Sequence, residues 1–289
     1  MKLSSALQLG RVSNLPTVWT NVLVGLAFVK ATDSYTIIWA AMAALSLIYL
    51  AGMFLNDAFD ADWDKQHKQN RPIVNGETTA KEVTVYACVF IILAMALLLG
   101  AARSGQALQV LVASALLIAS IVIYDWKHKS WKHSAWIMGS CRLWVYFLAA
   151  SLVASISTAL CLAGLSLMFY IAGITYLARS EHMNSLQSTW PIVLLLSPVV
   201  LAIYFSFSSA SPLISLLLVS ALVHWLLKGA LLLLPGKKRN IPQAIGILLS
   251  GMCLIDACFL YTLGAHMLTW LALLGFLLCL LLQKKIAAS

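Results

Sequence analysis

Residues 55–76 read LNDAFDADWDKQHKQNRPIVNG and join two very different kinds of sequence. Four of the ten acidic residues in the chain fall within the eight positions from Asp57 to Asp64. The run before them, residues 36–57, is almost entirely apolar and is long enough for a helix to cross a bilayer. Carboxylates gathered at the end of such a helix indicate a polar site at a membrane surface.

The composition of the chain excludes a water-soluble globule. Of the 289 residues, 62% are hydrophobic and 10% are charged, and the mean hydropathy is +0.91. Soluble domains are about half apolar and about a quarter charged. The net charge of +9 comes from Lys and Arg residues that mostly flank apolar runs, which is typical of membrane topology and not of nucleic-acid binding. We therefore predict an all-α, multi-pass transmembrane helical bundle that forms one domain over residues 1–289, in contact with membrane lipid and with no nucleic acid.

Apolar runs of about 20 residues mark the predicted membrane spans. We find ten, at residues 12–30, 36–57, 82–101, 106–124, 134–154, 157–178, 189–209, 212–234, 241–262 and 264–283. The last two are joined only by the residues GAH, so nine spans are the alternative. Pro191 and Pro198 lie within the run at 189–209. We expect a kink there rather than a break, because neighbouring groups can satisfy the freed backbone.

The distribution of Lys and Arg predicts the orientation of the bundle. Fifteen of the 19 basic residues fall on one side of the spans, and two, Lys30 and Arg103, fall on the other. Cytoplasmic loops carry the excess of positive charge, so we expect cytoplasmic termini in a bacterial inner membrane. Loops 58–81, 125–133 and 179–188, which hold nearly all the polar residues outside the spans, then share the cytoplasmic side.

The cysteines and the N-terminus add no further site. All six cysteines lie in apolar runs without a CxxC pair, where thiols pack as small apolar groups. Neither a zinc site nor a disulfide framework is predicted. The N-terminal sequence MKLSSALQLGRVSN lacks the apolar core of a cleaved signal peptide.

The acidic stretch has a helical order. If the helix over residues 36–57 continues at about 100° per residue, one arc of about 100° contains Asn56, Asp57, Asp60 and Asp64. Asp62 falls on the other side of the helix. Crowded carboxylates repel one another unless a cation lies between them, and oxygen ligands alone favour a hard cation such as Mg²⁺. We predict a magnesium site formed by Asn56, Asp57, Asp60 and Asp64, with the three aspartates also catalytic.

Basic residues follow the acidic face, at Lys65, Lys68 and Arg71. Carboxylates beside Lys and Arg are typical of sites where a metal bridges to phosphate and basic side chains neutralise the remaining oxygens. The alternative is a solvated helix end followed by a loop of mixed charge.

These residues resemble a known family. The sequence NDAFDADWD followed by RPIVNG is similar to the first motif of the UbiA superfamily of intramembrane prenyltransferases, NDxxDxxxD with a trailing RPxxxG. Tyr124 and Lys127 in YDWKHK resemble the Tyr-to-Lys element after that family's fourth helix. The stretch RVSNLPTVWTNVLVG resembles its first helix, with matches at Arg11, Asn14, Pro16, Asn21 and Gly25. The resemblance spans most of residues 11–182.

The resemblance implies an all-helical bundle, commonly of nine helices, around a central cavity that is open to lipid. It implies Mg²⁺ that holds an isoprenoid diphosphate, and an allylic cation that meets a lipophilic acceptor once the diphosphate leaves. Such a substrate has a long apolar tail and an anionic head, which accounts for carboxylates at the end of a membrane helix. We expect Asn56, Lys65, Lys68, Arg71, Tyr124 and Lys127 to bind this substrate.

The chain departs from the family pattern at one place. Relatives usually carry a second aspartate motif, DxxxD, at the cytoplasmic end of the sixth helix, where this chain reads ITYLARSEHMN. Glu181 is the only acid there, and Arg179 stands where negative charge is expected. Because a guanidinium can bind phosphate oxygens, we predict that Arg179 is a catalytic residue that replaces the second metal, and that Glu181 contacts substrate. The sequences GSCRLWVYF and TYLARSE resemble the divergent EboC-like branch.

Two polar residues inside the spans have alternative interpretations. Arg142 is either a cavity-facing phosphate ligand or counter-ion, or an interhelical partner of Asp256. Asn21 either reaches the cavity or forms a hydrogen bond between helices. In the functional interpretation both bind substrate.

We predict a Mg²⁺-dependent membrane prenyltransferase that moves an isoprenoid group from its diphosphate to an aromatic or other small lipophilic acceptor. The missing second motif favours an alternative, a non-catalytic carrier or binding protein for a polyprenyl or aromatic intermediate. An intramembrane terpene cyclase on the same scaffold is a further alternative, since it shares the ionisation step. No motif specifies an oligomeric state.

Overall fold

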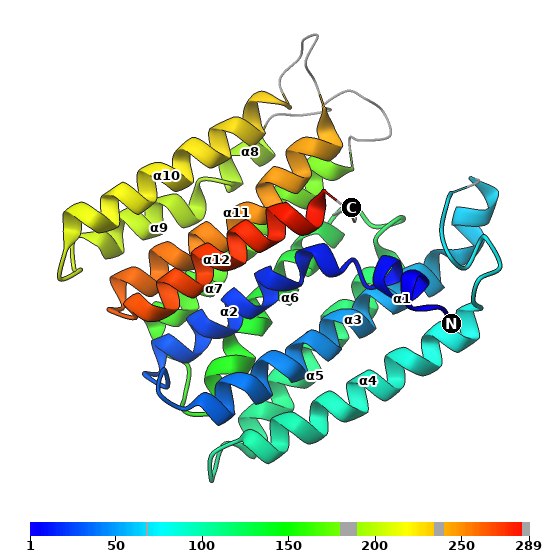
Figure 1. The fold of residues 1–289 in the computed structure, drawn as a ribbon, viewed down its shortest axis with the longest axis horizontal. Coiled ribbons are helices and arrows are strands. Elements are labelled where there is room, and N and C mark those ends of the chain that lie inside the picture. The colour runs from blue at the N-terminus through cyan, green and yellow to red at the C-terminus, as the bar shows by residue number, and fades with distance from the viewer. Residues whose placement is uncertain (68, 180–189, 234–239, 285–289) are drawn as a thin grey trace.

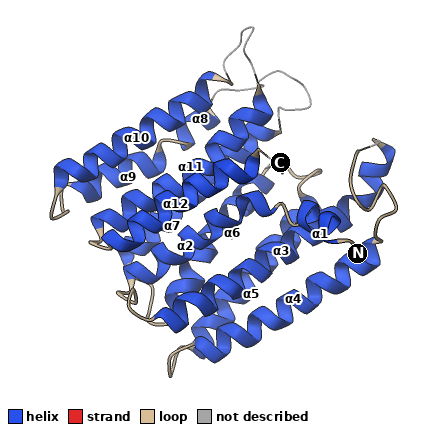
Figure 2. Ribbon diagram, in the orientation of Figure 1, coloured by secondary structure: helices blue, strands red, loops and turns tan. Residues whose placement is uncertain are grey.

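The computed structural model describes residues 1–67, 69–179, 190–233 and 240–284. Figure 2 shows helices joined by loops throughout these ranges. In chain order the helices are α1 (Leu3–Leu9), the 3₁₀ turn η1 (Val12–Asn14), α2 (Leu15–Phe28), α3 (Tyr35–Gln66), α4 (Ala80–Ala101), α5 (Ala107–Lys127), α6 (Ser134–Ser151), α7 (Thr158–Ala178), α8 (Pro191–Leu194), α9 (Ser197–Ser206), α10 (Pro212–Leu231), α11 (Ile241–Thr262) and α12 (His266–Gln283).

The predicted all-α architecture is confirmed over the described ranges, and each predicted span coincides with helical residues. Seven described helices have the length and hydropathy of a membrane span, namely α3, α4, α5, α7, α10, α11 and α12. Shorter apolar helices cover Val12–Phe28 and Pro191–Ser206, and α6 occupies the remaining predicted span. The chain is therefore an integral, multi-pass membrane protein.

Two helices form the centre of the bundle. Helix α2 packs against α3, α6, α11 and α12, and α11 packs against α2, α7, α9, α10 and α12. In Figure 1, α4 lies at one edge of the molecule and α10 at the opposite edge. Burial follows this order, since 78% of the apolar window of α11 is buried in the protein but only 22% of that of α4. The outer helices turn most of their apolar residues outward.

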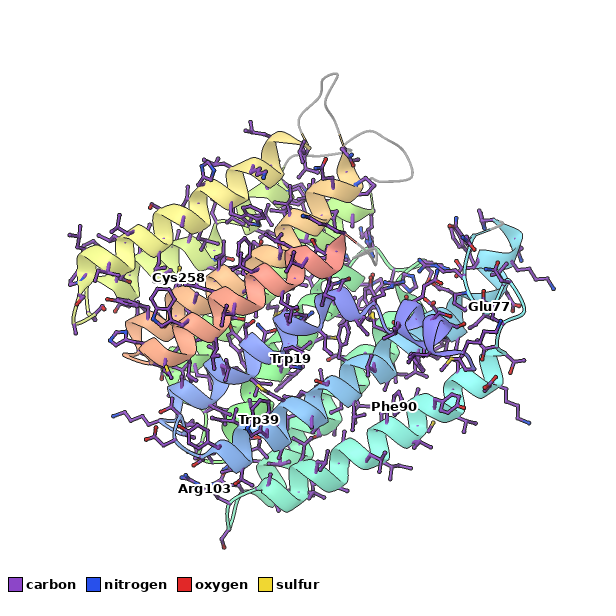
Figure 3. All side chains as sticks on the ribbon, viewed as in Figure 1. Trp19, Trp39, Glu77, Phe90, Arg103 and Cys258 are labelled. Carbon is purple, nitrogen blue, oxygen red and sulfur yellow. The ribbon has the colours of Figure 1, made fainter. Side chains whose placement is uncertain are left out.

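The outward faces carry large apolar side chains, as lipid contact requires. Trp39 on α3 is 69% exposed and Met267 on α12 is 79% exposed. In Figure 3, Trp39 and Trp19 lie on neighbouring helices, α3 and α2. Both line an open apolar groove of about 760 Å³ between α2, α3 and α12. The outer surface is thus apolar where a bilayer would cover it.

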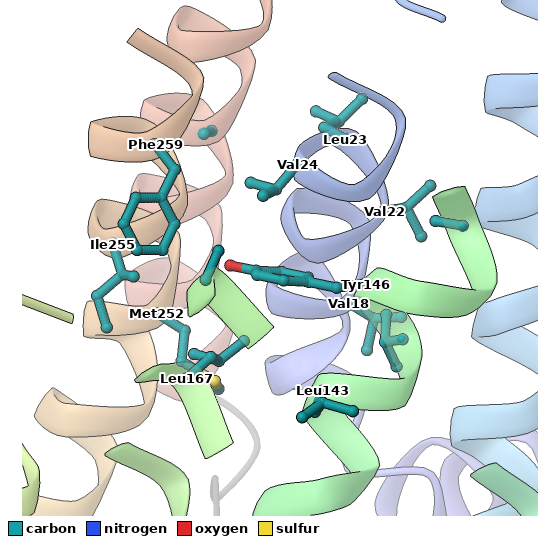
Figure 4. Packing of buried hydrophobic residues seen from close by; sticks show 14 of the residues in the cluster. Val18, Val22, Leu23, Val24, Leu143, Tyr146, Leu167, Met252, Ile255 and Phe259 are labelled. Atoms are coloured by element: carbon teal, nitrogen blue, oxygen red, sulfur yellow. The ribbon is translucent and has the colours of Figure 1, made fainter. Parts of the chain in front are cut away.

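Small residues bring the central helices close together. A Cβ at Gly25 of α2 would lie 2.5 Å from the carbonyl oxygen of Tyr146 and 2.9 Å from Cβ of Ala149, both on α6. Only glycine permits this approach of the two backbones. The Tyr146 ring then reaches between α2 and α11, with its hydroxyl pointing toward α11 (Figure 4).

The expected kink in the 189–209 run is a break in the structure, so that expectation was wrong. Helix α8 ends at Leu194 and α9 begins at Ser197, each with a proline in its first turn. Pro198 has no N–H to donate to the carbonyl of Leu194. The hydroxyl of Ser197 lies 2.8 Å from that carbonyl oxygen and 2.8 Å from that of Ser166 on α7. A side chain therefore replaces the backbone bond, and the helix can end and restart.

One end of the bundle collects the polar loops. Helix α3 continues beyond its predicted span to Gln66, and its last turns meet the α5–α6 loop. The end of α7 meets the same loop through Arg179. Figure 1 places the N-terminus and the C-terminal end of α12 toward this end as well. The candidate site is built where these segments meet.

Candidate active site

The acidic residues lie on the last turns of α3, where the exposed fraction of each side chain separates them into two groups. Asn56, Asp57 and Asp64 are 7%, 3% and 6% exposed, respectively. The Asp60 side chain is 16% exposed, whereas Asp62 is exposed. The four residues that share the predicted face therefore turn into the protein, and Asp62 turns out.

Helix α3 contacts α5, and the residues that follow α5, at three successive turns. At Gly52 a Cβ would lie 3.2 Å from Ile121, so the two helices are close here. One turn on, Asn56 Nδ2 donates to Asp125 Oδ1 at 3.0 Å. One turn further, Asp60 meets the residues that follow α5. Residues 52, 56 and 60 are each four positions apart, so they lie on one face of α3. This face is turned toward α5 and the residues that follow it.

Asn56 is held from two sides. While its Nδ2 donates to Asp125, its Oδ1 accepts from Arg11 Nη2 at 3.3 Å. The same Arg11 nitrogen lies 3.5 Å from Asp57 Oδ1. Arg11 adopts the left-handed conformation with φ of 40°, and its carbonyl accepts from the Tyr49 hydroxyl at 3.1 Å. The turn before η1 thereby directs a guanidinium at the start of the acidic face.

Asp60 is paired with a lysine and a histidine from the α5–α6 loop. Lys129 Nζ lies 2.6 Å from Asp60 Oδ1, and His128 Nε2 lies 3.5 Å from Asp60 Oδ2. Burial by itself would lower the pKa of His128, but its hydrogen bond to Asp60 and the charge of that carboxylate raise the pKa above its ordinary value. Lys129 also lies 4.1 Å from the ring centroid of Trp63. The loop therefore presents positive charge to the middle of the acidic face.

An apolar cavity of about 90 Å³ lies between α2, α3, α5 and α6, beside this end of α3. Its lining includes Tyr124 and Asp125 of α5, next to Asn56, and Tyr49 and Arg142 deeper in the bundle. The Tyr124 ring stacks on His128 with centroids 5.1 Å apart. The remaining lining is mostly aliphatic. A few polar groups thus line an otherwise apolar space.

Arg142 has contacts relevant to both interpretations, and its role as a phosphate ligand stays a prediction. Arg142 lines the cavity, and its Nη1 donates to Asn21 Oδ1 at 3.2 Å. Asn21 in turn donates to Asp256, which also accepts from the Tyr146 hydroxyl. Arg142 therefore reaches Asp256 through an amide. Asn21 itself is fully buried, so the structure places it between helices.

Arg179 contacts the α5–α6 loop. Its guanidinium donates to the carbonyl oxygens of His128, Trp131 and Lys132 at 3.2, 3.1 and 2.7 Å, and to the Ser134 hydroxyl. These bonds tie the end of α7 to the loop that carries His128 and Lys129. Direct binding of diphosphate by Arg179 stays a prediction, and in this arrangement its donors are bonded to the loop.

The other predicted binding residues lie at different distances from the acidic face. Arg71 is half-buried and close enough for its charge to act on Asp57 and Asp64. Lys65 is exposed. Lys127 lies over the Trp126 ring, 4.0 Å from its centroid. Lys68 and Glu181 lie outside the described residues.

The donor set fits a hard cation, although the side chains are not closed around one point. Among the described residues, no three His, Cys, Asp or Glu side chains converge as a metal site, since Asp57 faces Arg11 and Asp60 faces Lys129. The fit rests on the oxygen donors of the buried face and on Asp125 Oδ2, which is buried without a hydrogen-bond partner beside Asn56. An orphaned carboxylate oxygen is a suitable ligand for Mg²⁺.

Sequence reasoning missed three residues of this cluster. Asp125, His128 and Lys129 all contact the acidic motif, yet none was predicted to bind the metal or the substrate. One signal was present, because Asp125 ends an apolar span in a chain with only ten acids. Arg11 was noted as a match in the first helix, and its contact with Asn56 and Asp57 gives that match a physical meaning.

Among the described residues, the longest helix of the bundle ends in a buried acidic face beside an apolar cavity. A model of the UbiA prenyltransferase family matches residues 15–236, and the chain belongs to this family. The narrower resemblance to the EboC-like branch stays a prediction. No curated protein sequence matches the chain significantly.

Solved structures share the fold at low sequence identity. A UbiA homologue from Archaeoglobus fulgidus bound to GPP and Mg²⁺ has a TM-score of 0.66 and 15% identity, over 91% of this chain and 99% of that one. Its complex with DMAPP and Mg²⁺ has a TM-score of 0.64 and 17% identity, over 91% and 98%. A structure of digeranylgeranylglyceryl phosphate synthase has a TM-score of 0.60 and 19% identity, over 91% and 99%.

Proposed function

We propose that this protein is a Mg²⁺-dependent prenyltransferase that moves an isoprenoid group from its diphosphate to an aromatic or other small lipophilic acceptor. The observation that carries the proposal is the position of the buried acidic face of α3 next to an apolar cavity. The family membership supports it, as do the complexes of the Archaeoglobus fulgidus homologue with DMAPP, GPP and Mg²⁺.

The cation would be held by Asn56, Asp57, Asp60 and Asp64. When bound, it would neutralise charge on the diphosphate and make it a better leaving group. Arg11 and Lys129 now face Asp57 and Asp60, so a cation that binds these carboxylates must displace them. The two basic groups would then be free to turn toward phosphate oxygens, together with Lys65, Lys68 and Arg71.

In the proposed reaction the bond between C1 of the isoprenoid and the diphosphate oxygen breaks, and the electron pair leaves with the diphosphate. An electron pair of the acceptor forms the new bond to C1, and the acceptor loses a proton. The apolar lining of the cavity would hold the isoprenoid and exclude water, which would otherwise capture the allylic cation. The rings of Tyr124 and Tyr49, which line this cavity, can face that cation and stabilise it.

The same proposal includes roles for Arg142 and Arg179 and an orientation of the protein in the membrane. Arg142 lines the cavity and would meet a polar group of a substrate there, with Asn21 as its support. Arg179 would act on the diphosphate, and Glu181 would contact substrate near it. The bias of Lys and Arg to one side supports a cytoplasmic site, which we propose for a bacterial inner membrane.

Product analysis tests the proposal directly. Purified protein in lipid nanodiscs is supplied with labelled isoprenoid diphosphates of increasing length, a panel of aromatic acceptors, and Mg²⁺ or EDTA. We expect a prenylated acceptor in the presence of Mg²⁺ and none with EDTA. We expect the Asp57→Asn variant to make no prenylated acceptor. Binding of the diphosphate without any product across the panel favours the carrier, and a cyclised product without acceptor favours the cyclase.

A further inference from the structure

Asp125 is a buried carboxylate that no motif assigns. It lies in the last turn of α5, is 5% exposed, and lines the cavity beside the acidic face. Its Oδ1 accepts from Asn56 Nδ2 at 3.0 Å. Its Oδ2 is buried and has no hydrogen-bond partner in the described chain.

An unpartnered carboxylate oxygen in an apolar setting is costly, and buried carboxylates are normally paired or bound to metal. The basic groups near it, among the described residues, are used elsewhere. Lys129 and His128 Nε2 are on Asp60, His128 Nδ1 lies 3.1 Å from the backbone oxygen of Asp125, and Arg11 is on Asn56 and Asp57. The position therefore calls for a cation that the described residues do not supply.

Asp125 also stands where it can compensate for a feature that the sequence lacks. The end of the sixth span carries Arg179 and not the aspartates of a second acidic motif, and Arg179 bonds to the α5–α6 loop. Helix α5, which precedes the loop that Arg179 contacts, supplies a carboxylate that touches the first motif through Asn56. The amide of Asn56 is oriented by this bond, so that its oxygen faces the side of Asp57 and Arg11.

We propose that Asp125 is a further ligand of the divalent cation, and that its Oδ2 supplies an acidic ligand from α5 in place of the missing second motif. The proposal rests on the proposed function for the identity of the site. It concerns binding of the metal and not the transfer step. Hard oxygen ligands gathered from α3 and α5 suit Mg²⁺, and Mn²⁺ as its probe.

The test measures metal binding without any isoprenoid. Free Mn²⁺ is quantified by electron paramagnetic resonance during titration of the protein in nanodiscs, with and without inorganic pyrophosphate. Asp125→Asn retains the shape and an oxygen that can accept from Asn56, but it loses the charge. We expect Mn²⁺ affinity to fall about 10- to 100-fold in Asp125→Asn and less than about twofold in the control Asp62→Asn, which removes an exposed charge from α3.

A second measurement avoids dependence on how well the variant folds. Fe²⁺ bound in place of Mg²⁺, with ascorbate and peroxide, cleaves the wild-type backbone next to the metal. Cuts both near residues 56–60 and near residues 124–126 are expected. Cuts confined to α3, or wild-type Mn²⁺ affinity in Asp125→Asn, would overturn the assignment. If the wild-type protein transfers prenyl groups, the proposed function stands whichever result is found for Asp125. If Asp125→Asn loses Mn²⁺ binding but the wild-type protein makes no product, only the assignment of Asp125 as a metal ligand stands.

Discussion

Asn21 connects Arg142 to Asp256 across three helices of the bundle. Its Oδ1 accepts from Arg142 Nη1 at 3.2 Å and its Nδ2 donates to Asp256 Oδ2 at 2.8 Å. Opposite charges inside a membrane bundle are costly unless they are paired or bridged. A single amide, which has both a donor and an acceptor, bridges them here and joins α6, α2 and α11.

This bridge predicts a graded loss of stability. Asp256→Ala removes the acceptor of both Asn21 and Tyr146, whereas Tyr146→Phe removes one donor. At about 0.6–2 kcal/mol for each hydrogen bond inside a membrane, Asp256→Ala should cost roughly twice as much as Tyr146→Phe. Thermal unfolding in detergent measures both. Equal midpoints for Asp256→Ala and wild type would contradict a structural role for the network.

The face of α3 predicts unequal effects for two neighbouring aspartates. Asp60→Ala should weaken Mg²⁺-dependent binding of an isoprenoid diphosphate by at least about 100-fold, because it removes a ligand, and loss of even a supporting group costs 10- to 100-fold. Asp62→Ala should change binding less than about twofold, because that side chain is exposed. Calorimetric titration with a non-hydrolysable analogue compares them. Equal damage from both changes would refute the one-face arrangement.

Arg179 allows a test of direct against indirect action on the diphosphate. Charge-assisted hydrogen bonds contribute about 1.5–3 kcal/mol, so Arg179→Ala should weaken diphosphate binding roughly 10- to 100-fold, and Arg179→Lys less. Hydrogen exchange of residues 128–134 is measured in parallel, since Arg179 bonds to this loop. Weaker binding with unchanged exchange indicates direct contact, and weaker binding with faster exchange indicates action through the loop. Unchanged binding in Arg179→Ala would reject both.

The close contact of α2 and α6 predicts opposite outcomes for two glycines. In Gly25→Ala the new methyl meets the backbone oxygen of Tyr146 at 2.5 Å, so the helices must separate at a cost of about 1–3 kcal/mol. Gly100 has nothing within 4 Å of its Cβ position, and Gly100→Ala should stabilise α4 by about 0.5–1 kcal/mol. Unfolding midpoints of the two variants should move in opposite directions. A Gly25→Ala protein as stable as wild type would contradict the packing.

The charge bias of the loops predicts the side of the membrane on which each connection lies. Reporter fusions at Asp33, between α2 and α3, and at Gly105, between α4 and α5, should be active only outside the cytoplasm. A fusion at Asn75, in the loop after α3, should report a cytoplasmic location. A cytoplasmic signal from Asp33 or Gly105 would invert the proposed orientation.

Local periodicity was enough to predict much of this molecule. Apolar runs of about 20 residues located the helices, because in lipid a helix satisfies its own backbone. The arc that separated Asp62 from Asn56, Asp57, Asp60 and Asp64 required only the helical repeat. The burial of these side chains follows the same division. What depends on neighbours within one helix can be worked out from sequence.

Contacts between distant segments could not be found this way. Asp125 meets Asn56 across 69 positions, and Lys127, which was predicted in the site, lies on Trp126 while Lys129 reaches Asp60. A shift of two residues at a helix end changes the direction of a side chain by about 200°. The break between Pro191 and Pro198 was missed for a similar reason, since it depends on Ser197, which replaces a backbone bond.

Helix α3 has 32 residues, which gives it a length of about 48 Å, whereas the hydrocarbon layer of a bilayer is about 30 Å thick. Its apolar part and its acidic part therefore sit in different solvents. Under the proposed function, the two products would separate by solubility as soon as they form. Diphosphate would leave into water past the charged end, and the prenylated product would dissolve in the bilayer. Each product would then be diluted in a phase that the other does not enter, which would oppose the reverse reaction without further energy.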